Sequence, residues 1–139
     1  MGAQQSIEKV NFEDVKFAVD SDGFVLVNTL PSGKQDCLIK GTIHADDETI
    51  RLNKLLRENV STKVIVYGEN SCDPRAEAKC HQLRALGFIY VYLYAGGLFE
   101  WLLLQDIYGA DRFPTTSDEM DHLKYRGSQT FGVKRITQS

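Results

Sequence analysis

The chain has 139 residues, of which 42% are hydrophobic and 25% are charged, a composition typical of one globular domain. A formal net charge of −3 gives no reason to expect nucleic-acid binding, and every apolar run is shorter than the roughly 20 residues of a membrane-spanning helix. The three cysteines, Cys37, Cys72 and Cys80, have neither the even number of a disulfide framework nor the spacing of a zinc site. We therefore expect reduced thiols, a cytoplasmic location, and no metal or other cofactor.

The first residues, M-G-A-Q-Q-S, match the N-myristoylation pattern M-G-x-x-x-[ST], with Gly2 as the acceptor. Residues 1–10 are expected to be a flexible N-terminus, and the alternative to acylation is that the short pattern is a chance match in this polar stretch. A single myristoyl chain binds membranes weakly and reversibly, and no cysteine lies nearby for a second acyl group. We expect at most a weak peripheral membrane association through Gly2.

The next part of the chain alternates between helix and strand signals. A helix is expected from Asn11, with Asp14 at the capping-box distance, followed by a strand over residues 24–29. Residues 37–43 fit one short strand interrupted at Gly41, and His44 after it is expected to be a surface residue without a metal. Acids at 46 and 47 open a helix that ends near residue 59. The inward side chains of this helix are expected to be Ile50, Leu52, Leu55 and Leu56.

Residues 63–97 carry the clearest pattern. A β-branched and aromatic strand over 64–67 leads through a loop into a helix, and a second strand over 89–94 ends at two glycines. Asp73 suits the helix N-cap, Pro74 suits its first turn, and Gly87 suits its end. The buried helix face is expected to include Ala78, Leu83 and Leu86. Strand, helix and strand form a βαβ unit, so the two strands should be parallel in one sheet.

A recognisable set of residues lies in this region: a strand that ends in tyrosine, a helix that closes on L-x-x-L-G-F, two glycines and an aromatic helix with a tryptophan. They are Tyr67, Leu83, Leu86, Gly87, Phe88, Gly96, Gly97 and Trp101. This half of the chain resembles a rhodanese-like domain, and residues 24–29 and 39–43 resemble the family's first strand and its G-H-I-x-G-A segment. The resemblance covers residues 11–109 and leaves 110–139 as a C-terminal extension. It implies an α/β, rhodanese-like fold of about five mostly parallel strands with helices on both faces.

Two positions depart from the family that the chain resembles. In its sulfurtransferases the strand ends in Tyr-Cys and this cysteine carries the persulfide, whereas here the position is Gly68. The family's first strand ends in Asp-x-Arg, whereas here it ends in Asn28-Thr29-Leu30. The resemblance therefore supports the fold more than the chemistry.

The loop after the first strand of the βαβ unit is the candidate ligand loop, because free N–H groups and the positive end of a helix dipole point into such loops. Its candidate ligand residues are Gly68, Glu69, Asn70, Ser71, Cys72, Asp73 and Arg75. The candidate catalytic residues are Cys72 and Arg75.

Opposing charges surround the loop thiol. The helix N-terminus favours a thiolate at Cys72, whereas Glu69, Asp73 and Glu77 repel it. Cys72 also lies late in the loop, so we expect it to have no catalytic role. Arg75 is expected to pair with Glu69 or Asp73. Elsewhere, Cys80 is expected to pack in the core, and a nucleophilic pair of Ser71 with His81 is rejected because helical turns separate them.

The helix expected over residues 97–108 has more apolar residues than one buried face requires. Either it is buried on two sides, which we favour, or it offers an apolar patch to a partner. Ser117 is expected to cap a last helix that reaches Tyr125, followed by a polar, basic and poorly ordered tail from Arg126.

The leading functional hypothesis is a catalytically degenerate rhodanese-like domain that acts as a binding or regulatory module for an unidentified protein partner. The alternative is a sulfurtransferase for thiosulfate or persulfide that uses Cys72. A phosphatase-like enzyme is a third option, which the acidic loop disfavours.

Overall fold

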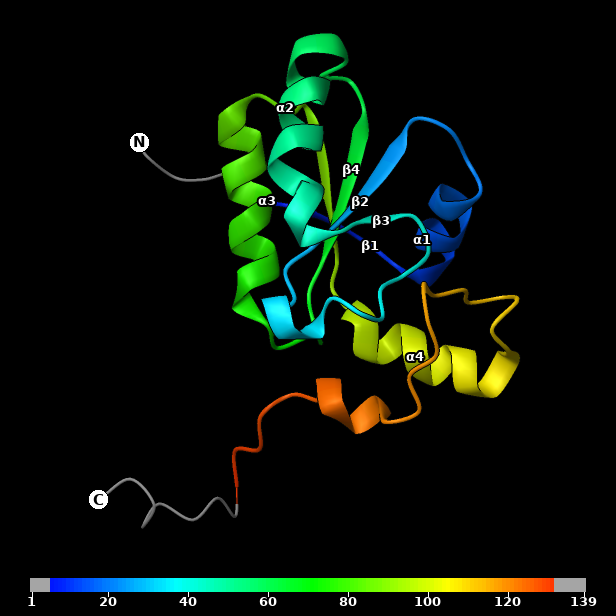
Figure 1. The fold of residues 1–139 in the computed structure, drawn as a ribbon. Helices are drawn as coiled ribbons and strands as arrows, with labels where there is room; N and C mark the ends of the chain where they lie inside the picture. Colours follow the sequence, from blue (N-terminus) through cyan, green and yellow to red (C-terminus); the bar gives the residue numbers. More distant parts are fainter. Residues whose placement is uncertain (1–5, 132–139) are drawn as a thin grey trace.

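The computed structural model describes residues 6–131. Nine helices and strands follow one another in these residues: β1 (Glu8–Val10), α1 (Phe12–Val19), β2 (Phe24–Asn28), β3 (Thr42–Ile43), α2 (Glu48–Glu58), β4 (Lys63–Tyr67), α3 (Pro74–Leu86), β5 (Tyr90–Tyr94) and α4 (Gly97–Tyr108). Short 3₁₀ helices lie at η1 (Ser32–Lys34), η2 (Ala45–Asp47) and η3 (His122–Tyr125). The strands form one wholly parallel sheet in the order β1-β5-β4-β2-β3 (Figure 1), which confirms the predicted α/β fold.

Helices cover both faces of the sheet, as Figure 1 shows. The central strand β4 alternates its side chains between the two layers, as strand geometry requires. Val64 and Val66 pack in the cluster that contains α2 and α3, whereas Ile65 and Tyr67 pack in the cluster that contains α1 and α4. Because β4 is buried on both faces, its sequence is a continuous apolar run and not an alternating one.

The sheet begins earlier than the sequence indicated. Residues 1–10 were expected to be a flexible terminus, but Glu8–Val10 pair with Tyr92–Tyr94 as the edge strand β1. Ile7, just before this strand, is buried in the core. A three-residue strand is too short to show a periodic pattern, so sequence analysis could not detect it. The acceptor of the predicted acyl group, Gly2, lies outside the described residues.

The expected buried faces of α2 and α3 are partly wrong. In α3 the buried side chains are Ala76, Cys80 and Leu83, at the i, i+4, i+7 spacing of one helix face, whereas Ala78 and Leu86 are exposed. In α2 only Leu52 is fully buried, Leu55 and Leu56 are half-buried, and Ile50 is 73% exposed. Each helix buries a narrower stripe than its apolar composition suggests.

The segment after η1 is not the predicted strand. Only Thr42–Ile43 form β3, while residues 37–40 pair with the C-terminal extension. Leu38 N–H donates to Thr116 Oγ1 at 3.0 Å, Thr116 N–H donates to Leu38 O at 2.8 Å, and Ile39 forms an antiparallel bridge with Thr115. Segments almost 80 residues apart in the sequence therefore lie side by side.

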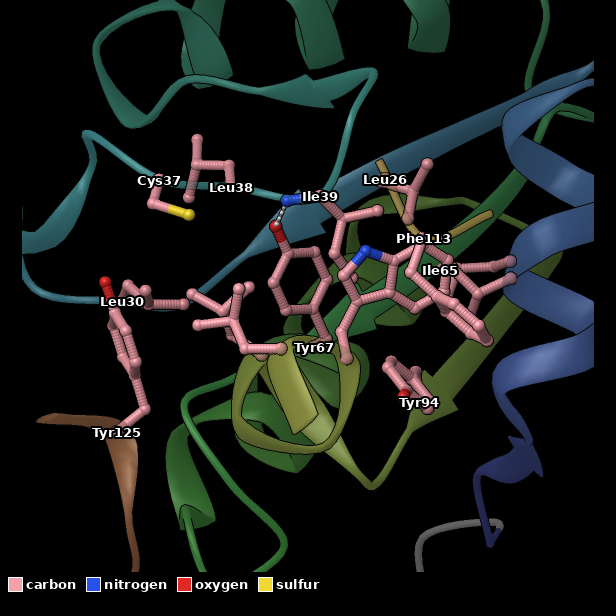
Figure 2. Packing of buried hydrophobic residues seen from close by; sticks show 14 of the residues in the cluster. Leu26, Leu30, Cys37, Leu38, Ile39, Ile65, Tyr67, Tyr94, Phe113 and Tyr125 are labelled. Atoms are coloured by element: carbon pink, nitrogen blue, oxygen red, sulfur yellow. Dashed lines mark hydrogen bonds between the residues drawn. The ribbon is translucent and has the colours of Figure 1, made fainter. Parts of the chain in front are cut away.

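The C-terminal helix predicted from Ser117 is also wrong. The Ser117 hydroxyl donates to Asp36 O at 2.8 Å, and between Ser117 and Phe131, where the described residues end, the only helical turn is η3. Its last residue, Tyr125, is buried in the same cluster as Phe113 and Trp101. Figure 2 shows the Tyr125 ring extending from the C-terminal segment, and Phe113 lying within the cluster. The extension therefore contributes to the core of the domain.

The prediction that α4 is buried on two sides is wrong. Leu98, Trp101 and Leu102 are buried, but Leu103, Ile107 and Tyr108 are 40%, 68% and 55% exposed.

Within residues 6–131, none of the helices has the length and apolar content needed to span a lipid bilayer.

Candidate functional site

The candidate loop, residues 68–73, connects β4 to α3 at the carboxyl edge of the sheet. From β2 the chain moves outward to β3, and from β4 it moves in the opposite direction to β5. The carboxyl ends of β2 and β4 therefore flank the point where the strand order reverses, which is where ligands bind in open parallel sheets. The sequence predicted this position for the loop.

The carboxylate of Asp73 fills the loop. As predicted, Asp73 caps α3: its Oδ1 accepts from Arg75 N–H at 3.0 Å, and Pro74 occupies the first turn. Its Oδ2 accepts from Glu69 N–H at 3.2 Å, across the loop. The side chain of Asp73 is only 3% exposed. The N–H groups of Glu69 and Arg75 thus bind an anion, and that anion belongs to the chain itself.

The guanidinium of Arg75 closes over this carboxylate. Its Nε donates to Asp73 Oδ1 at 2.9 Å, and its Nη2 donates to Asp73 Oδ2 at 3.0 Å and to Glu69 Oε2 at 2.9 Å. Burial alone would raise the pKa of Asp73, but the hydrogen bonds from the Arg75 side chain, from its main chain and from Glu69 N–H outweigh burial and lower the pKa. The Asp73 hydrogen bond in turn raises the pKa of Arg75. The predicted pairing of Arg75 is confirmed, and it involves both acids.

Lys34, in η1, is a partner of the loop that the sequence analysis missed. Its Nζ lies 2.6 Å from Glu69 Oε1 and 3.2 Å from Lys124 O, so it connects the loop to the C-terminal segment. Asn70 makes a second connection, because its Nδ2 donates to Tyr125 O at 2.8 Å. Lys34 and Tyr125 are 35 and 55 residues away from their loop partners, and no local sequence signal marks such contacts.

The start of α4 holds the loop from another side. Leu98 N–H donates to Gly68 O at 3.0 Å, and Phe99 N–H donates to Glu69 O at 2.8 Å. Gly97 has a φ of 69°, and a Cβ added to it would lie 2.8 Å from both Asn70 N and Gly68 O. Only glycine allows α4 to approach the loop main chain this closely.

Gly68 lies next to the carboxylate of Asp73. A Cβ at this position would lie 2.7 Å from Asp73 Oδ2 and 3.0 Å from Thr29 Oγ1. Any side chain at Gly68 would therefore require the Asp73 carboxylate to shift from its observed position.

The end of β2 has a structural role. The Asn28 side chain is buried; its Oδ1 accepts from Leu30 N–H at 2.9 Å, and its Nδ2 donates to Ile43 O at 3.2 Å and to Gln35 Oε1 at 3.1 Å. Thr29 N–H donates to Tyr67 O at 3.0 Å. These bonds hold the carboxyl ends of β2, β3 and β4 together. Tyr67 points toward Ile39, whose N–H donates to the phenol oxygen at 3.0 Å (Figure 2).

The three thiols differ in environment. Cys72 is exposed on the loop, and its N–H donates to Asn70 Oδ1 at 2.9 Å. Gly127 covers one side of it, since a Cβ at Gly127 would be 3.5 Å from the sulfur. Cys80 is buried, as predicted, and burial raises its pKa to about 12; burial also raises the pKa of Cys37.

The remaining polar candidates do not combine into a site. His81 Nε2 lies 3.6 Å from Glu77 Oε2, and no hydrogen bond joins His81 to Ser71 within residues 6–131. His44 Nδ1 accepts from Asp46 N–H at 3.0 Å and caps η2. Over the same residues, no group of three or more His, Cys, Asp or Glu side chains is arranged to hold a metal ion.

The sequence and the fold of this chain match a known family. The model of the rhodanese-like domain matches residues 6–104. The chain belongs to this family. The match ends before Pro114, Tyr125 and the rest of the C-terminal segment that contacts the loop.

Solved structures agree with this assignment at the level of the fold. Ygr203w of Saccharomyces cerevisiae, described as a homolog of single-domain rhodanese and of the Cdc25 phosphatase catalytic domain, is 20% identical, with a TM-score of 0.61 over 83% of this chain and 90% of that one. The single-domain sulfurtransferase RDL2 of the same yeast is 21% identical, with a TM-score of 0.53 over 81% and 99%. BH2092 of Bacillus halodurans is 16% identical, with a TM-score of 0.60 over 86% and 90%. A comparison with curated proteins found no significant match.

Proposed function

We propose that the chain is a catalytically degenerate rhodanese-like domain that acts as a binding or regulatory module. The observation that carries this proposal is the Asp73 carboxylate, which accepts hydrogen bonds from the N–H groups of Glu69 and Arg75 that would otherwise be available to an anionic substrate or a reactive sulfur. Gly68, at the position where the family resemblance places the sulfur-carrying cysteine, has no side chain and no room for one while Asp73 is in place.

The alternative is a sulfurtransferase that uses Cys72, and the similarity to the yeast sulfurtransferase RDL2 favours it. The loop geometry argues against it. The N–H groups of Glu69 and Arg75 bind Asp73, and the N–H of Cys72 itself binds Asn70. None of these three donors is free to stabilise a persulfide on Cys72.

A thiosulfate:cyanide sulfurtransferase assay tests the proposal. We expect wild-type protein to show no turnover above the uncatalysed rate, with yeast RDL2 as the positive control. Gly68→Cys should not gain activity either, because the new thiol would be forced against the Asp73 carboxylate. Turnover comparable to RDL2 that is abolished by Cys72→Ser, with the fold unchanged by circular dichroism, would contradict the proposal and support the alternative.

The same proposal includes a cytoplasmic location with a weak, reversible membrane tether at Gly2. The location rests on the three cysteines, which have neither the number of a disulfide framework nor the spacing of a zinc site. The tether rests on the N-terminal sequence pattern and on the marginal membrane affinity of one acyl chain.

A further inference from the structure

A hollow of about 360 Å³ lies between the outer side of the loop and the C-terminal segment. We propose that it binds a phosphoryl dianion carried on a side chain of a partner protein. This inference rests on the proposed binding function and names the ligand chemistry. The site differs from the loop interior, because Asp73 occupies the interior and because two of the lining cations, Lys124 and Arg126, lie beyond the family match.

Within residues 6–131, four cations from three separate segments line this hollow. They are Lys34 of η1, Arg75 of α3, and Lys124 and Arg126 of the C-terminal segment. The contacts of Lys34 and Asn70 with the main chain of Lys124 and Tyr125 hold the three segments together. Because Tyr125 is buried, its anchoring fixes the cations on either side of it. The formal net charge of the chain is −3, so the gathering of these four cations results from the tertiary structure and not from an overall positive charge.

In the hollow the acidic side chains lie deeper than the basic ones. The two acids that line it, Glu69 and Asp73, are only 14% and 3% exposed, whereas Arg75 is 49% exposed and Lys124 is 37% exposed. Arg75 and Lys34 cover these acids, so the surface that faces solvent is mainly cationic. Glu119 pairs with Lys124 at 3.0 Å but does not line the hollow.

Several donors on these cations have no protein acceptor among the described residues. Arg75 uses Nε and Nη2 toward the two acids, which leaves Nη1. Arg126 donates only through Nη1, to Leu123 O at 2.8 Å, which leaves Nε and Nη2. Guanidinium groups with unused N–H pairs bind phosphoryl oxygens in a bidentate manner.

The number and spread of these donors favour a phosphoryl group over a single carboxylate. A phosphorylated side chain carries a charge of about −1.5 to −2 and three acceptor oxygens, so it can contact cations from more than one segment. Recognition of phosphorylated segments by clustered arginines is an established mode of peptide binding. Ser128 and Asn70 also line the hollow, beside the space that the residues flanking the phosphoryl group would occupy.

NMR titration of the full chain tests the proposal. The probe is the peptide Ac-Gly-Gly-pSer-Gly-Gly-NH₂, and the comparison ligands are the same peptide without the phosphate and inorganic phosphate. We expect the phosphopeptide to shift the amide signals of Cys72, Arg126 and Ser128, and the unphosphorylated peptide to leave them unchanged. Arg126→Gln should weaken binding about tenfold, as loss of one charge-assisted contact requires. Arg57→Gln, an exposed arginine in the last turn of α2, removes the same charge elsewhere and should change affinity less than about twofold.

The possible outcomes separate the two proposals. Absence of phosphate-dependent shifts in these amides, or equal weakening by Arg126→Gln and Arg57→Gln, would overturn the site. Inorganic phosphate binding as tightly as the phosphopeptide would contradict the protein-borne ligand and point to free phosphate. If Arg126→Gln disturbs the C-terminal segment in the spectrum, Lys124→Gln repeats the test from the neighbouring cation. Sulfurtransferase turnover in the same preparations would overturn the proposed non-catalytic function whatever the titration shows.

Discussion

Replacing Gly68 by alanine tests whether the Asp73 carboxylate occupies the loop. The new Cβ would lie 2.7 Å from Asp73 Oδ2 and 3.1 Å from Asp73 Cγ, well inside ordinary contact. Because Asp73 is almost buried and is bonded to Glu69 and Arg75, it cannot move without losing hydrogen bonds. Overpacking costs about 1–3 kcal/mol and a weakened N-cap costs about 0.5–2 kcal/mol, so we expect Gly68→Ala to lower the free energy of unfolding by about 1.5–5 kcal/mol.

A double-mutant cycle with Asp73→Ser assigns this loss to one contact. Serine keeps a capping oxygen for α3 but removes the carboxylate that obstructs the new Cβ. In the Asp73→Ser background, Gly68→Ala should cost less than about 0.5 kcal/mol, which corresponds to a coupling energy of at least about 1 kcal/mol between the two positions. Urea denaturation followed by circular dichroism measures all four free energies. If the two changes are additive within about 0.5 kcal/mol, Asp73 does not fill the space beside Gly68 and the reasoning is refuted.

Three further predictions follow from the same geometry and from the N-terminal pattern. Gly97→Ala should cost more than about 2 kcal/mol, because it combines a positive φ with two main-chain clashes, whereas Gly33→Ala, with no atoms within 4 Å, should change the unfolding free energy by less than about 0.5 kcal/mol. Folding lowers the pKa of Asp73, so the stabilising effect of its carboxylate is complete above the unfolded pKa of about 3.9 and is lost as the pH falls through the folded pKa. The difference in urea midpoint between wild type and Asp73→Asn should therefore narrow below about pH 4. A difference that stays constant down to about pH 2 would contradict this prediction. Protein from a eukaryotic source should lack Met1 and carry a myristoyl group on Gly2, and an intact mass that shows a free or acetylated terminus would end this idea.

The sequence predicted the parts of the fold that are specified locally. The strand–loop–helix–strand unit over β4, α3 and β5 has a β-branched run, an N-cap at Asp73, Pro74 in the first turn and Gly87 at the end, and each signal acts within a few residues. Elements specified by tertiary contacts were missed. Edge strand β1 exists because β5 offers it a partner, and residues 37–40 pair with the extension because Thr116 is brought beside Leu38.

The same distinction applies to the site. The pairing of Arg75 with Asp73 and Glu69 could be predicted, because the three residues lie within one loop and its helix. The contacts of Lys34 and Tyr125 with the loop could not be predicted, because they depend on how η1 and the C-terminal segment pack over the carboxyl edge of the sheet. The burial of α4 was overestimated for a related reason: its apolar composition shows that it packs, but only the neighbouring elements determine how many of its sides are covered.

The C-terminal segment and the loop form one structural unit, and truncation tests this. A chain that ends after Gly109 lacks Phe113 and Tyr125, which are 3% and 1% exposed. It also lacks Pro114, whose carbonyl accepts from the buried Trp101 Nε1 at 3.1 Å. Loss of one buried aromatic side chain costs about 3–5 kcal/mol, so loss of both consumes most of the roughly 5–15 kcal/mol that stabilises a domain.

We therefore expect the fragment that ends after Gly109 to be unfolded by circular dichroism. A fragment that ends after Ser128 keeps Tyr125 and the four cations of the hollow, and it should unfold cooperatively within about 1 kcal/mol of the full chain. Cooperative unfolding of the shorter fragment, with the denaturant dependence expected for its length, would contradict this argument and separate the extension from the domain. If instead only the longer fragment folds, the C-terminal segment that packs over the loop is part of the folding unit. The segment that supplies Lys124 and Arg126 to the hollow is then also the segment that completes the core.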